Sequence, residues 1–590
     1  MHGDIRQLDS MIKKAYYFSF RVNGRPVRFL LTVATLLAGL SIRPVAAQDL
    51  SVVGQWSSPQ AWPVTAVHNH MLPTGKVLSW GYSDEAWLWD PATAGLTPAA
   101  RAGYNTFCAG HSFLPDGRLL VTGGNISNGV GLPNAATYDP ASDSWVRLPN
   151  MNAGRWYPTN TTLANGDALV VSGDVDTVQG VNRLPQIWQG ATGAWRDLTG
   201  AQLALPLYPF MHLAPNGRVF ASGPSQVTWY LDTTGSGSWS AVANSIYGFR
   251  SYGSSVLYDD GKVLIVGGND PPTNTAEVID LNASTPAWRS VSPMTYKRRQ
   301  INATLLPDGT VLVTGGSSSP GFNEPAGAVY AGELWDPVAE TWTTVASFTQ
   351  YRGYHSFTLL LPDGRVLSGG GDASMSAEVY SPGYLFKGAR PVITSAPSTV
   401  TYGQPFFVTT ADAAQISRVN LLRLSSVTHA FNMKQRINRL AFSAAADGLN
   451  VAGPTNANLS PPGHYMLFIL NGSGVPSLAK IVRVDAAAPP AAPSGLTATA
   501  VSASRIDLNW TDNSATEDGF RIERCTGVVN VTCTDAGFAQ IAQTGPNTTT
   551  YSDTGLSAAT AYSYRVRAFN GAGNSVYSNT ATAVTSVPLL

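Results

Sequence analysis

Seven hairpin-like segments recur through the first two thirds of this 590-residue chain. Each copy has an apolar run, a tight turn that usually contains Asp-Gly or Asn-Gly, a second apolar run and a glycine, as in "LPDGRLLVTGG" at Leu114 and "LLPDGTVLVTGG" at Leu305. This pattern is typical of a β-hairpin. The turn glycines are Gly75, Gly117, Gly166, Gly217, Gly261, Gly309 and Gly364. The repeats therefore limit the chain to a repetitive β architecture.

The repeat period indicates which architecture this is. Successive turn glycines are 42, 49, 51, 44, 48 and 55 residues apart, and most copies are followed by a segment such as "ELWDPVAETWTTV" that supplies two further strands. Four strands in a repeat of about 40–50 residues are typical of a β-propeller, and the longer period is kelch-like. We therefore expect an all-β fold with a seven-bladed kelch-type β-propeller at residues 48–390.

The period stops after Pro391. Alternating strands up to Asp485 predict an Ig-like β-sandwich at residues 391–485, and residues 486–492 are a stiff Ala/Pro linker. The last segment, residues 493–590, resembles a fibronectin type III domain, with Trp510 in the core position and Tyr562 in the tyrosine-corner position. Such modules are usually spacers, so we expect no catalytic role for it.

The N-terminus predicts export. Arginines precede the largely apolar run at residues 29–40, and small residues precede a cleavage site expected after Ala47, which makes residues 1–47 a signal peptide. We expect a secreted or periplasmic protein with no membrane span once the signal is removed. Lys+Arg and Asp+Glu both number 37, so nothing in the charge balance favours nucleic acid as a partner.

One of the three cysteines has no obvious partner. Cys525 and Cys533 are close in sequence, and in an oxidising compartment a local disulfide is plausible, which leaves Cys108 to be explained. Blades are related by rotation, so residues at one offset from the turn glycine surround the channel at a similar height. Nine residues before the glycine, the occupants are Ala66, Cys108, Tyr157, Tyr208, Tyr252, Gln300 and His355. Cys108 therefore shares this ring with tyrosines and a histidine.

The ring and its neighbours also include side chains that can bind a metal. Tyr354 precedes His355, so Cys108, Tyr157, Tyr354 and His355 are expected to converge at the channel mouth, where propellers place their sites. Each residue alone would be ordinary packing, but the set is chemically specific. Imidazole nitrogen with phenolate oxygen suits Cu(II). A further nitrogen ligand is expected, and His429 lies in a predicted hairpin loop that could enter the channel from the second domain.

The sequence resembles the copper-radical oxidases, the galactose oxidase and glyoxal oxidase family, over about residues 50–485. The segments that carry this resemblance are "NTFCAGHSFLPDG", "RWYPTN", "GYHSFTLLLPDGRV", "VTHAFNMKQR" and "PPGHYMLFILNGSGVPS". Their order and spacing are specific to the family. The form "RWYPT" is closer to the glyoxal oxidase branch.

The resemblance implies a role for each matched residue. Cys108 would form a thioether with the ring of Tyr157, which would be the radical site and an equatorial copper ligand. Tyr354 would be the axial ligand and general base, and His355 and His429 would be the two imidazole ligands. The expected cofactors are therefore one copper per chain and a self-derived Cys108–Tyr157 thioether radical.

Several neighbouring residues have weaker support. Trp156 is a candidate to shield the radical, because "GDVDTVQGVNRLP" lacks the tryptophan that galactose oxidase stacks over its thioether. Arg250 is a candidate contact for substrate oxygens, and Tyr208 and Tyr252 could line the channel mouth. Five histidines have no motif support as ligands and are expected to be structural: His68, His70, His111, His212 and His464.

Two classes of function follow. The first is a secreted oxidase that converts a small, glyoxal-like aldehyde or a primary alcohol with O2 and releases H2O2; polysaccharide-borne alcohols, with the fibronectin domain as spacer, are a variant of it. The alternative is a non-catalytic secreted propeller that binds glycans or cell-surface partners. The intact set of Cys108, Tyr157, Tyr354, His355 and His429 favours the oxidase, because a retired site is expected to lose at least one member.

Overall fold

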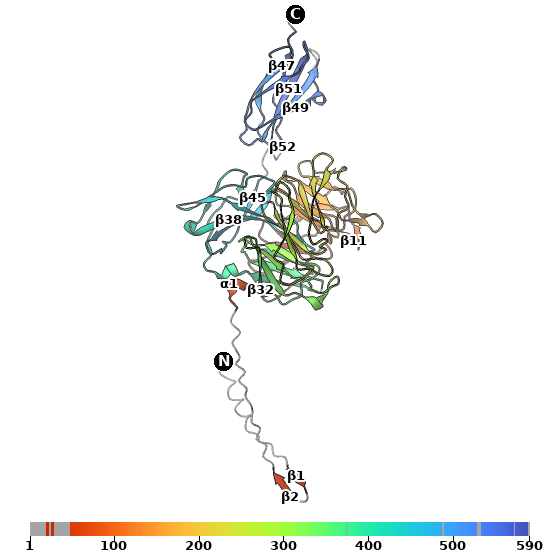
Figure 1. The fold of residues 1–590 in the computed structure, drawn as a ribbon, viewed down its shortest axis with the longest axis vertical. Helices are drawn as coiled ribbons and strands as arrows, with labels where there is room; N and C mark the ends of the chain where they lie inside the picture. Colours follow the sequence, from red (N-terminus) through yellow and green to blue (C-terminus); the bar gives the residue numbers. More distant parts are fainter. Residues whose placement is uncertain are drawn as a thin grey trace. The chain divides into compact units, whose positions relative to one another are not determined.

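The computed structural model of the chain (Figure 1) describes residues 19–22, 25–28, 48–372, 374–485, 489–527, 533–570 and 573–587. The chain divides into a short unit, residues 1–48, and a large unit, residues 49–590. In the short unit, β1 (Ser19–Val22) pairs with β2 (Arg25–Arg28); the rest of the predicted signal peptide lies outside the described residues. No helix within the described residues is long and apolar enough to cross a membrane.

Seven sheets of the large unit correspond to the seven repeats, and we call them blades 1 to 7. The first strands of consecutive blades contact one another in a ring, which β39 (Ser426–Thr428) of the second domain closes between blades 1 and 2. The blades are therefore arranged around a central axis. The all-β, kelch-type propeller prediction is confirmed, and these sheets are consistent with seven blades.

The strand bounds follow the repeats. Blade 1 contains β5 (His68–Met71), β6 (Val77–Trp80), β7 (Ala86–Trp89) and β8 (Leu96–Pro98), and blade 2 contains β9 (Gly110–Phe113), β10 (Leu119–Thr122), β13 (Ala135–Asp139) and β14 (Ser144–Leu148). Blade 3 contains β15 (Thr159–Thr162), β16 (Ala168–Val171), β19 (Gln186–Gln189) and β20 (Ala194–Asp197). Blade 4 contains β21 (Phe210–Leu213), β22 (Val219–Gly223), β23 (Val227–Asp232) and β24 (Ser238–Asn244). Blades 5 to 7 contain β25 (Ser254–Asp259), β26 (Lys262–Val266), β27 (Ala276–Asp280), β28 (Trp288–Val291); β29 (Asn302–Leu305), β30 (Val311–Thr314), β31 (Ala331–Asp336), β32 (Thr341–Ser347); and β33 (Ser356–Leu360), β34 (Val366–Gly370), β35 (Ser376–Ser381).

The turns of the repeats have the conformation that their sequence predicts. All seven turn glycines have positive φ, between 72° and 94°, a region that glycine enters without the steric cost of a Cβ. In blade 1 the turn is closed by the N–H of Gly75, which donates to the carbonyl of Leu72 at 3.0 Å. The first two strands of every blade are almost entirely buried, which explains their continuous apolar runs.

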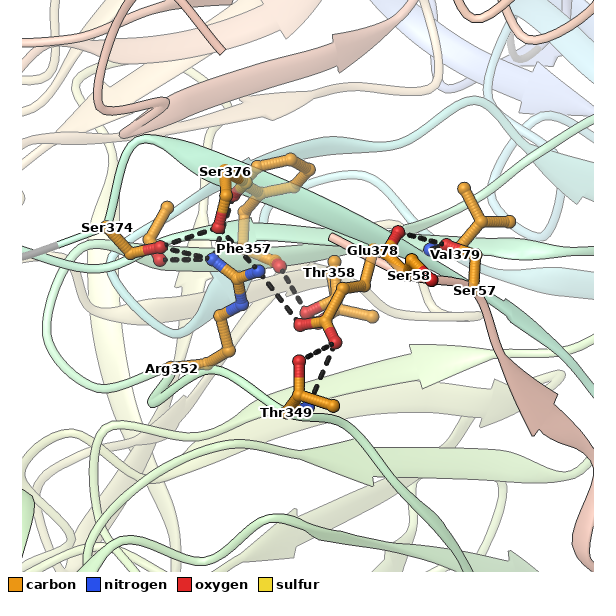
Figure 2. Close-up of polar contacts among 12 residues, drawn as sticks. Ser57, Ser58, Thr349, Arg352, Phe357, Thr358, Ser374, Ser376, Glu378 and Val379 are labelled. Atoms are coloured by element: carbon orange, nitrogen blue, oxygen red, sulfur yellow. Dashed lines mark hydrogen bonds and ion pairs between the residues drawn. The ribbon is translucent and has the colours of Figure 1, made fainter. Parts of the chain in front are cut away.

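The two ends of the propeller meet in blade 7. There β3 (Gln55–Trp56), which precedes the first repeat, pairs with β35 as the outer strand. Figure 2 shows the adjacent contact, in which the Ser57 hydroxyl accepts the N–H of Val379 at 2.9 Å. The Ser57 N–H in turn donates to the Val379 carbonyl at 2.8 Å. Pairing between distant parts of the chain thus closes the ring.

The second domain is a two-sheet sandwich with its own apolar core. Its strands are β36 (Thr399–Val400), β45 (Lys480–Val484), β44 (Gly463–Asn471), β38 (Ile416–Arg423) and β41 (Ile437–Leu440) in one sheet and β37 (Phe406–Thr409), β43 (Gly448–Val451) and β42 (Phe442–Ala445) in the other. A hairpin of β39 and β40 (Phe431–Asn432) leaves the domain and extends blade 1, with Ser426 opposite His70. This hairpin brings the His429 segment into the ring of first strands.

The C-terminal segment is a further two-sheet sandwich. Its strands are β46 (Ser494–Ala500), β47 (Arg505–Thr511), β50 (Thr550–Thr554), β48 (Gly519–Gly527), β49 (Ala539–Thr544), β51 (Ala561–Asn570), β52 (Gly573–Asn574) and β53 (Ala581–Val584). Trp510 is buried in its core, and the Tyr562 hydroxyl accepts the N–H of Ser557 at 3.0 Å, as in a tyrosine corner. Cys525 and Cys533 form a disulfide, as expected.

Candidate active site

The ring residues share an uncommon backbone conformation. Six of the seven positions nine residues before a turn glycine have positive φ: Cys108, Tyr157, Tyr208, Tyr252, Gln300 and His355. For residues other than glycine this left-handed region is strained, and such strain gathers at functional sites. The conformation breaks the alternation of side chains just before each first strand, so a ring residue and its predecessor can face the same side.

Tyr157 and Tyr354 meet at the centre of the site. Their hydroxyl oxygens are 2.5 Å apart, and Nε2 of His429 is 2.9 Å from the Tyr157 hydroxyl. Burial raises the pKa of both tyrosines well above the ordinary value, and the nearby Cys108 raises that of Tyr157 further. Without a cation between them, both phenols therefore remain protonated at neutral pH.

His355 presents an unpartnered nitrogen to the same place. Its Nδ1 is 2.5 Å from Oδ1 of Asp372. Burial alone would raise the pKa of Asp372, but hydrogen bonds from His355, Tyr82 and Asn323 hold it below its usual value. The ionised carboxylate therefore accepts a hydrogen bond from the Nδ1–H of His355. Nε2 of His355 then has a buried lone pair with no hydrogen-bond partner in the described structure.

His429 reaches the site at the tip of the β39–β40 hairpin. The two loop residues, His429 and Ala430, both have positive φ, 47° and 70°, as a two-residue type I′ turn requires. Asn and Gly are the usual residues there, so the histidine occupies a costly position. Oγ1 of Thr428 lies 2.6 Å from Nδ1 of His429. The imidazole rings of His355 and His429 have centroids 4.5 Å apart.

Cys108 and Trp156 flank the ring of Tyr157. Cys108 is a free, fully buried thiol in the same apolar cluster as Tyr157. Burial raises the pKa of this thiol. Trp156 stacks on Tyr157 at 3.7 Å and 8°, and Tyr208 covers the other face at 4.6 Å and 24°. The Tyr157 ring is therefore enclosed on both faces.

Arg250 is not suited to the substrate contact expected of it. It is fully buried and ion-paired with Glu277, and its Nη1 donates to the carbonyl of Gly267 at 3.0 Å. In the same way, Arg298 donates to the carbonyl of Gly315 and pairs with Glu333. Arg352 donates to the carbonyl of Gly370 and pairs with Glu378, as Figure 2 shows. Arg250 is thus a repeated structural residue of the blades, and the candidate contact is withdrawn.

A cleft opens beside the tyrosines and His429. It has a volume of about 230 Å³ and is lined by Tyr157, Pro206, Leu207, Tyr208, Phe210, Pro224, Phe249, Ser251, Tyr252 and His429. None of these side chains is a carboxylate, lysine or arginine. A larger cleft of about 590 Å³ around Asp280 and Arg439 contains none of the site residues. A compound that reaches Tyr157 through the smaller cleft therefore meets mainly apolar and aromatic surface.

The donor set fits copper. It offers two imidazole nitrogens and two phenol oxygens, a combination that suits Cu(II), and the buried Nε2 of His355 has no hydrogen-bond partner among the described residues, so its lone pair is available to a metal. In the described part of the chain, no group of three or more His, Cys, Asp and Glu side chains is placed to hold a metal. The site relies instead on tyrosine oxygens.

Sequence reasoning missed Asp372 and Tyr82, which hold His355. Tyr82 donates to Oδ1 of Asp372 at 2.9 Å. The available signal was the position of Asp372 directly after the glycine run that ends the seventh hairpin. The five histidines expected to be structural do not contact the paired tyrosines through any hydrogen bond of the described residues.

Comparisons with known proteins match the domains of this chain to known families. The glyoxal oxidase N-terminus family matches residues 85–232, the galactose oxidase-like early set domain residues 390–484, the kelch motif residues 250–295 and the fibronectin type III domain residues 491–584. Galactose oxidase of Gibberella zeae is 28% identical over 493 residues, 73% of this chain and 71% of that protein. Aldehyde oxidase GLOX of Vitis pseudoreticulata is 28% identical over 436 residues, 64% of this chain and 82% of that protein.

A solved structure is also similar. A fungal alcohol oxidase in complex with copper superimposes with a TM-score of 0.68 at 26% identity, over 73% of this chain and 100% of that one. The family matches, the relatives and this structure cover both the propeller and the second domain. Over the propeller and the second domain, the chain is therefore similar to galactose oxidases and glyoxal oxidases.

Proposed function

We propose that the protein is an exported copper-radical oxidase that converts a primary alcohol to an aldehyde, or a hydrated aldehyde to an acid, and reduces O2 to H2O2. The observation that carries this proposal is the unpartnered Nε2 of His355 beside the paired hydroxyls of Tyr157 and Tyr354. In this proposal, residues 48–390 form the catalytic propeller, residues 391–485 supply His429, and residues 493–590 are a spacer.

The ligands would be the hydroxyl oxygens of Tyr157 and Tyr354 and the Nε2 atoms of His355 and His429. Copper, when bound, supplies the positive charge that favours ionised phenols and accepts one electron. Asp372 keeps the His355 lone pair available, because it holds the proton of that ring on Nδ1. The second domain is required, since it contributes His429 on the hairpin.

The thioether supplies the second electron acceptor. Its C–S bond would form between Sγ of Cys108 and the ring of Tyr157, with loss of the thiol hydrogen and one ring hydrogen; two electrons and two protons pass to O2, giving H2O2. Sulfur bonded to the ring delocalises an unpaired electron. Trp156 and Tyr208, stacked on either face, would exclude water from the oxidised ring.

The oxidation requires one proton acceptor and one hydrogen acceptor. Tyr354 would take the hydroxyl proton of the substrate as general base, and the oxidised Tyr157 ring would take a hydrogen atom from the adjacent carbon. The substrate loses two electrons and two hydrogens in all. O2 accepts the two electrons and the two hydrogens and leaves as H2O2, so atoms and electrons balance.

The cleft supports a choice among substrates. Its lining of Pro206, Leu207, Pro224 and Phe249, with no charged side chain, offers few partners for the hydroxyls of a sugar. Unpaired polar groups in such a cleft cost free energy. We therefore favour free primary alcohols and aldehydes with an apolar remainder over galactosyl termini.

Peroxide release tests this function. Copper-loaded protein would be assayed with a benzylic alcohol, a glyoxal-like aldehyde and galactose, each beside Cys108→Ser protein. We expect H2O2 from the wild type with the first or second substrate and little from the variant. Binding of glycans without peroxide from any of the three would favour the alternative, a non-catalytic secreted propeller.

A further inference from the structure

A line of buried hydrogen bonds connects Cys108 to the second domain. The Cys108 N–H donates to Nε2 of His68 at 3.1 Å, and Nδ1 of His68 lies 3.2 Å from Nε2 of His111. Nδ1 of His111 is 2.6 Å from the Ser426 hydroxyl, which is also 2.9 Å from Nδ1 of His70. All three histidines have no exposed surface. The proposed oxidation uses none of these side chains.

One backbone amide sets the direction of every proton along this line. Because an amide can only donate, Nε2 of His68 must accept, and the His68 proton is on Nδ1. His111 therefore accepts on Nε2 and donates from Nδ1 to Ser426. The Ser426 proton is then free for His70. This order requires neutral rings, and burial lowers the pKa of His68 and of His111.

Cys108 differs here from three other ring residues. At three other ring positions the N–H donates to the carbonyl of the preceding ring residue: Tyr157 to Cys108, Tyr208 to Tyr157, and Gln300 to Tyr252, at 2.8–2.9 Å. The preceding ring residue of Cys108 is Ala66, yet the acceptor is the imidazole of His68. An imidazole thus replaces a carbonyl at the residue that the proposed thioether uses.

We infer that His68 is a positioning residue for thioether formation: its imidazole holds the main chain of Cys108 in the left-handed conformation, φ 64°, that keeps the thiol in the apolar cluster that contains Tyr157. This inference rests on the proposed function. His111 and Ser426 fix the tautomer of His68. Ser426 belongs to the hairpin that carries His429, so seating of this hairpin and orientation of Cys108 depend on each other.

The rate of cross-linking tests this role. Full-length, copper-free protein would be mixed with Cu(II) in air, and the joined Cys108 and Tyr157 peptides followed by mass spectrometry. In His68→Phe the ring can still stack on Trp80, 5.2 Å away in the wild type, but cannot accept the Cys108 N–H. Joined peptides should form about tenfold more slowly or worse, with the same copper content.

Two further variants separate positioning from packing. In His68→Gln the side-chain oxygen can accept the same N–H, so most of the rate should return. His212→Phe is the matched control, because His212 is a buried histidine on the first strand of blade 4 with its own serine partner, Ser255, at 2.9 Å. This variant should cross-link at the wild-type rate.

A wild-type rate in His68→Phe would overturn the inference, as would equal losses in His68→Phe and His68→Gln. If His68→Phe does not fold, Ser426→Ala decides: it breaks the line two hydrogen bonds away and should slow cross-linking about threefold, whereas an unchanged rate overturns the inference. Failure of the proposed function has a different result, because the wild type itself would then yield no joined peptides.

Discussion

Trp156 and Tyr157 are consecutive residues, yet their rings lie face to face, with centroids 3.7 Å apart and planes 8° from parallel. In a regular strand, neighbouring side chains point to opposite faces. The left-handed conformation of Tyr157, φ 68°, removes this alternation. Tyr354 and His355 are stacked in the same way at 3.8 Å, with His355 at φ 65°. The strained ring position therefore delivers two adjacent side chains to one site.

Removal of the Trp156 ring should shorten the life of the oxidised enzyme. In Trp156→Ala the thioether still forms and copper still binds, but one face of Tyr157 becomes open to water. Since aromatic stacking contributes about 0.5–1.5 kcal/mol, we expect the tyrosyl radical to decay up to about tenfold faster, as followed by its optical absorbance. Trp195→Ala, at a partly buried blade tryptophan outside the site, is the control. An unchanged decay would remove the shielding role.

Loss of His429 should weaken copper binding. His429→Ala removes one of two imidazole ligands, so the affinity measured by chelator competition should fall about 100-fold or more, beyond the 10–100-fold typical of outer-shell changes. His464→Gln, which changes a histidine that takes no part in the donor set, should keep the wild-type affinity. Equal affinities for the wild type and His429→Ala would mean that the second domain supplies no ligand.

Arg250→Met should destabilise the fold without a specific effect on substrate. It leaves Glu277 buried and uncompensated, which costs about 3–5 kcal/mol of the free energy of unfolding, as measured by urea denaturation. Arg289→Met breaks the exposed pair with Glu340 and should cost at most about 1 kcal/mol. A normal stability with a raised KM in Arg250→Met would restore the substrate role that the structure argues against.

The copper-free protein should lose stability as the pH falls below about 6.5. Burial lowers the pKa of both His111 and His212 to about 3, so between about pH 6.5 and 3 the unfolded chain binds protons that the folded chain does not. Each histidine then lowers the free energy of unfolding by about 1.4 kcal/mol per pH unit. His212→Gln should reduce this slope by the contribution of one histidine, about 1.4 kcal/mol per pH unit, between pH 6 and 4.5. A slope equal to that of the wild type would contradict the lowered pKa of His212.

The sequence predicted much of the fold and site because the repeat fixes geometry. Residues at one offset from the turn glycine share one height in the ring, so the repeat alone predicts that Cys108, Tyr157 and His355 lie close together. The substrate contact expected of Arg250 is wrong, because its buried side chain pairs with Glu277. An arginine recurs eleven residues before the turn glycine in three blades, at Arg155, Arg250 and Arg298. That recurrence marks a structural residue of the blades.

Other features of the site are not encoded in the repeat. The contact of Asp372 with His355 and the line from His68 to Ser426 depend on how loops and the hairpin pack in the channel, and no periodicity encodes that packing. The left-handed conformation of the ring residues was also hidden, because Cys, Tyr and His are not typical of it. Tertiary packing imposes this conformation at each blade.

Peptide mass spectrometry after aerobic loading with copper tests the central claim most directly. The peptides that contain Cys108 and Tyr157 should appear joined, with the loss of two hydrogens, and Cys108→Ser protein should show only separate peptides while it keeps its fold and most of its copper. Joined peptides would establish the cofactor that the account predicts. Separate, unmodified peptides in copper-loaded wild-type protein would contradict it.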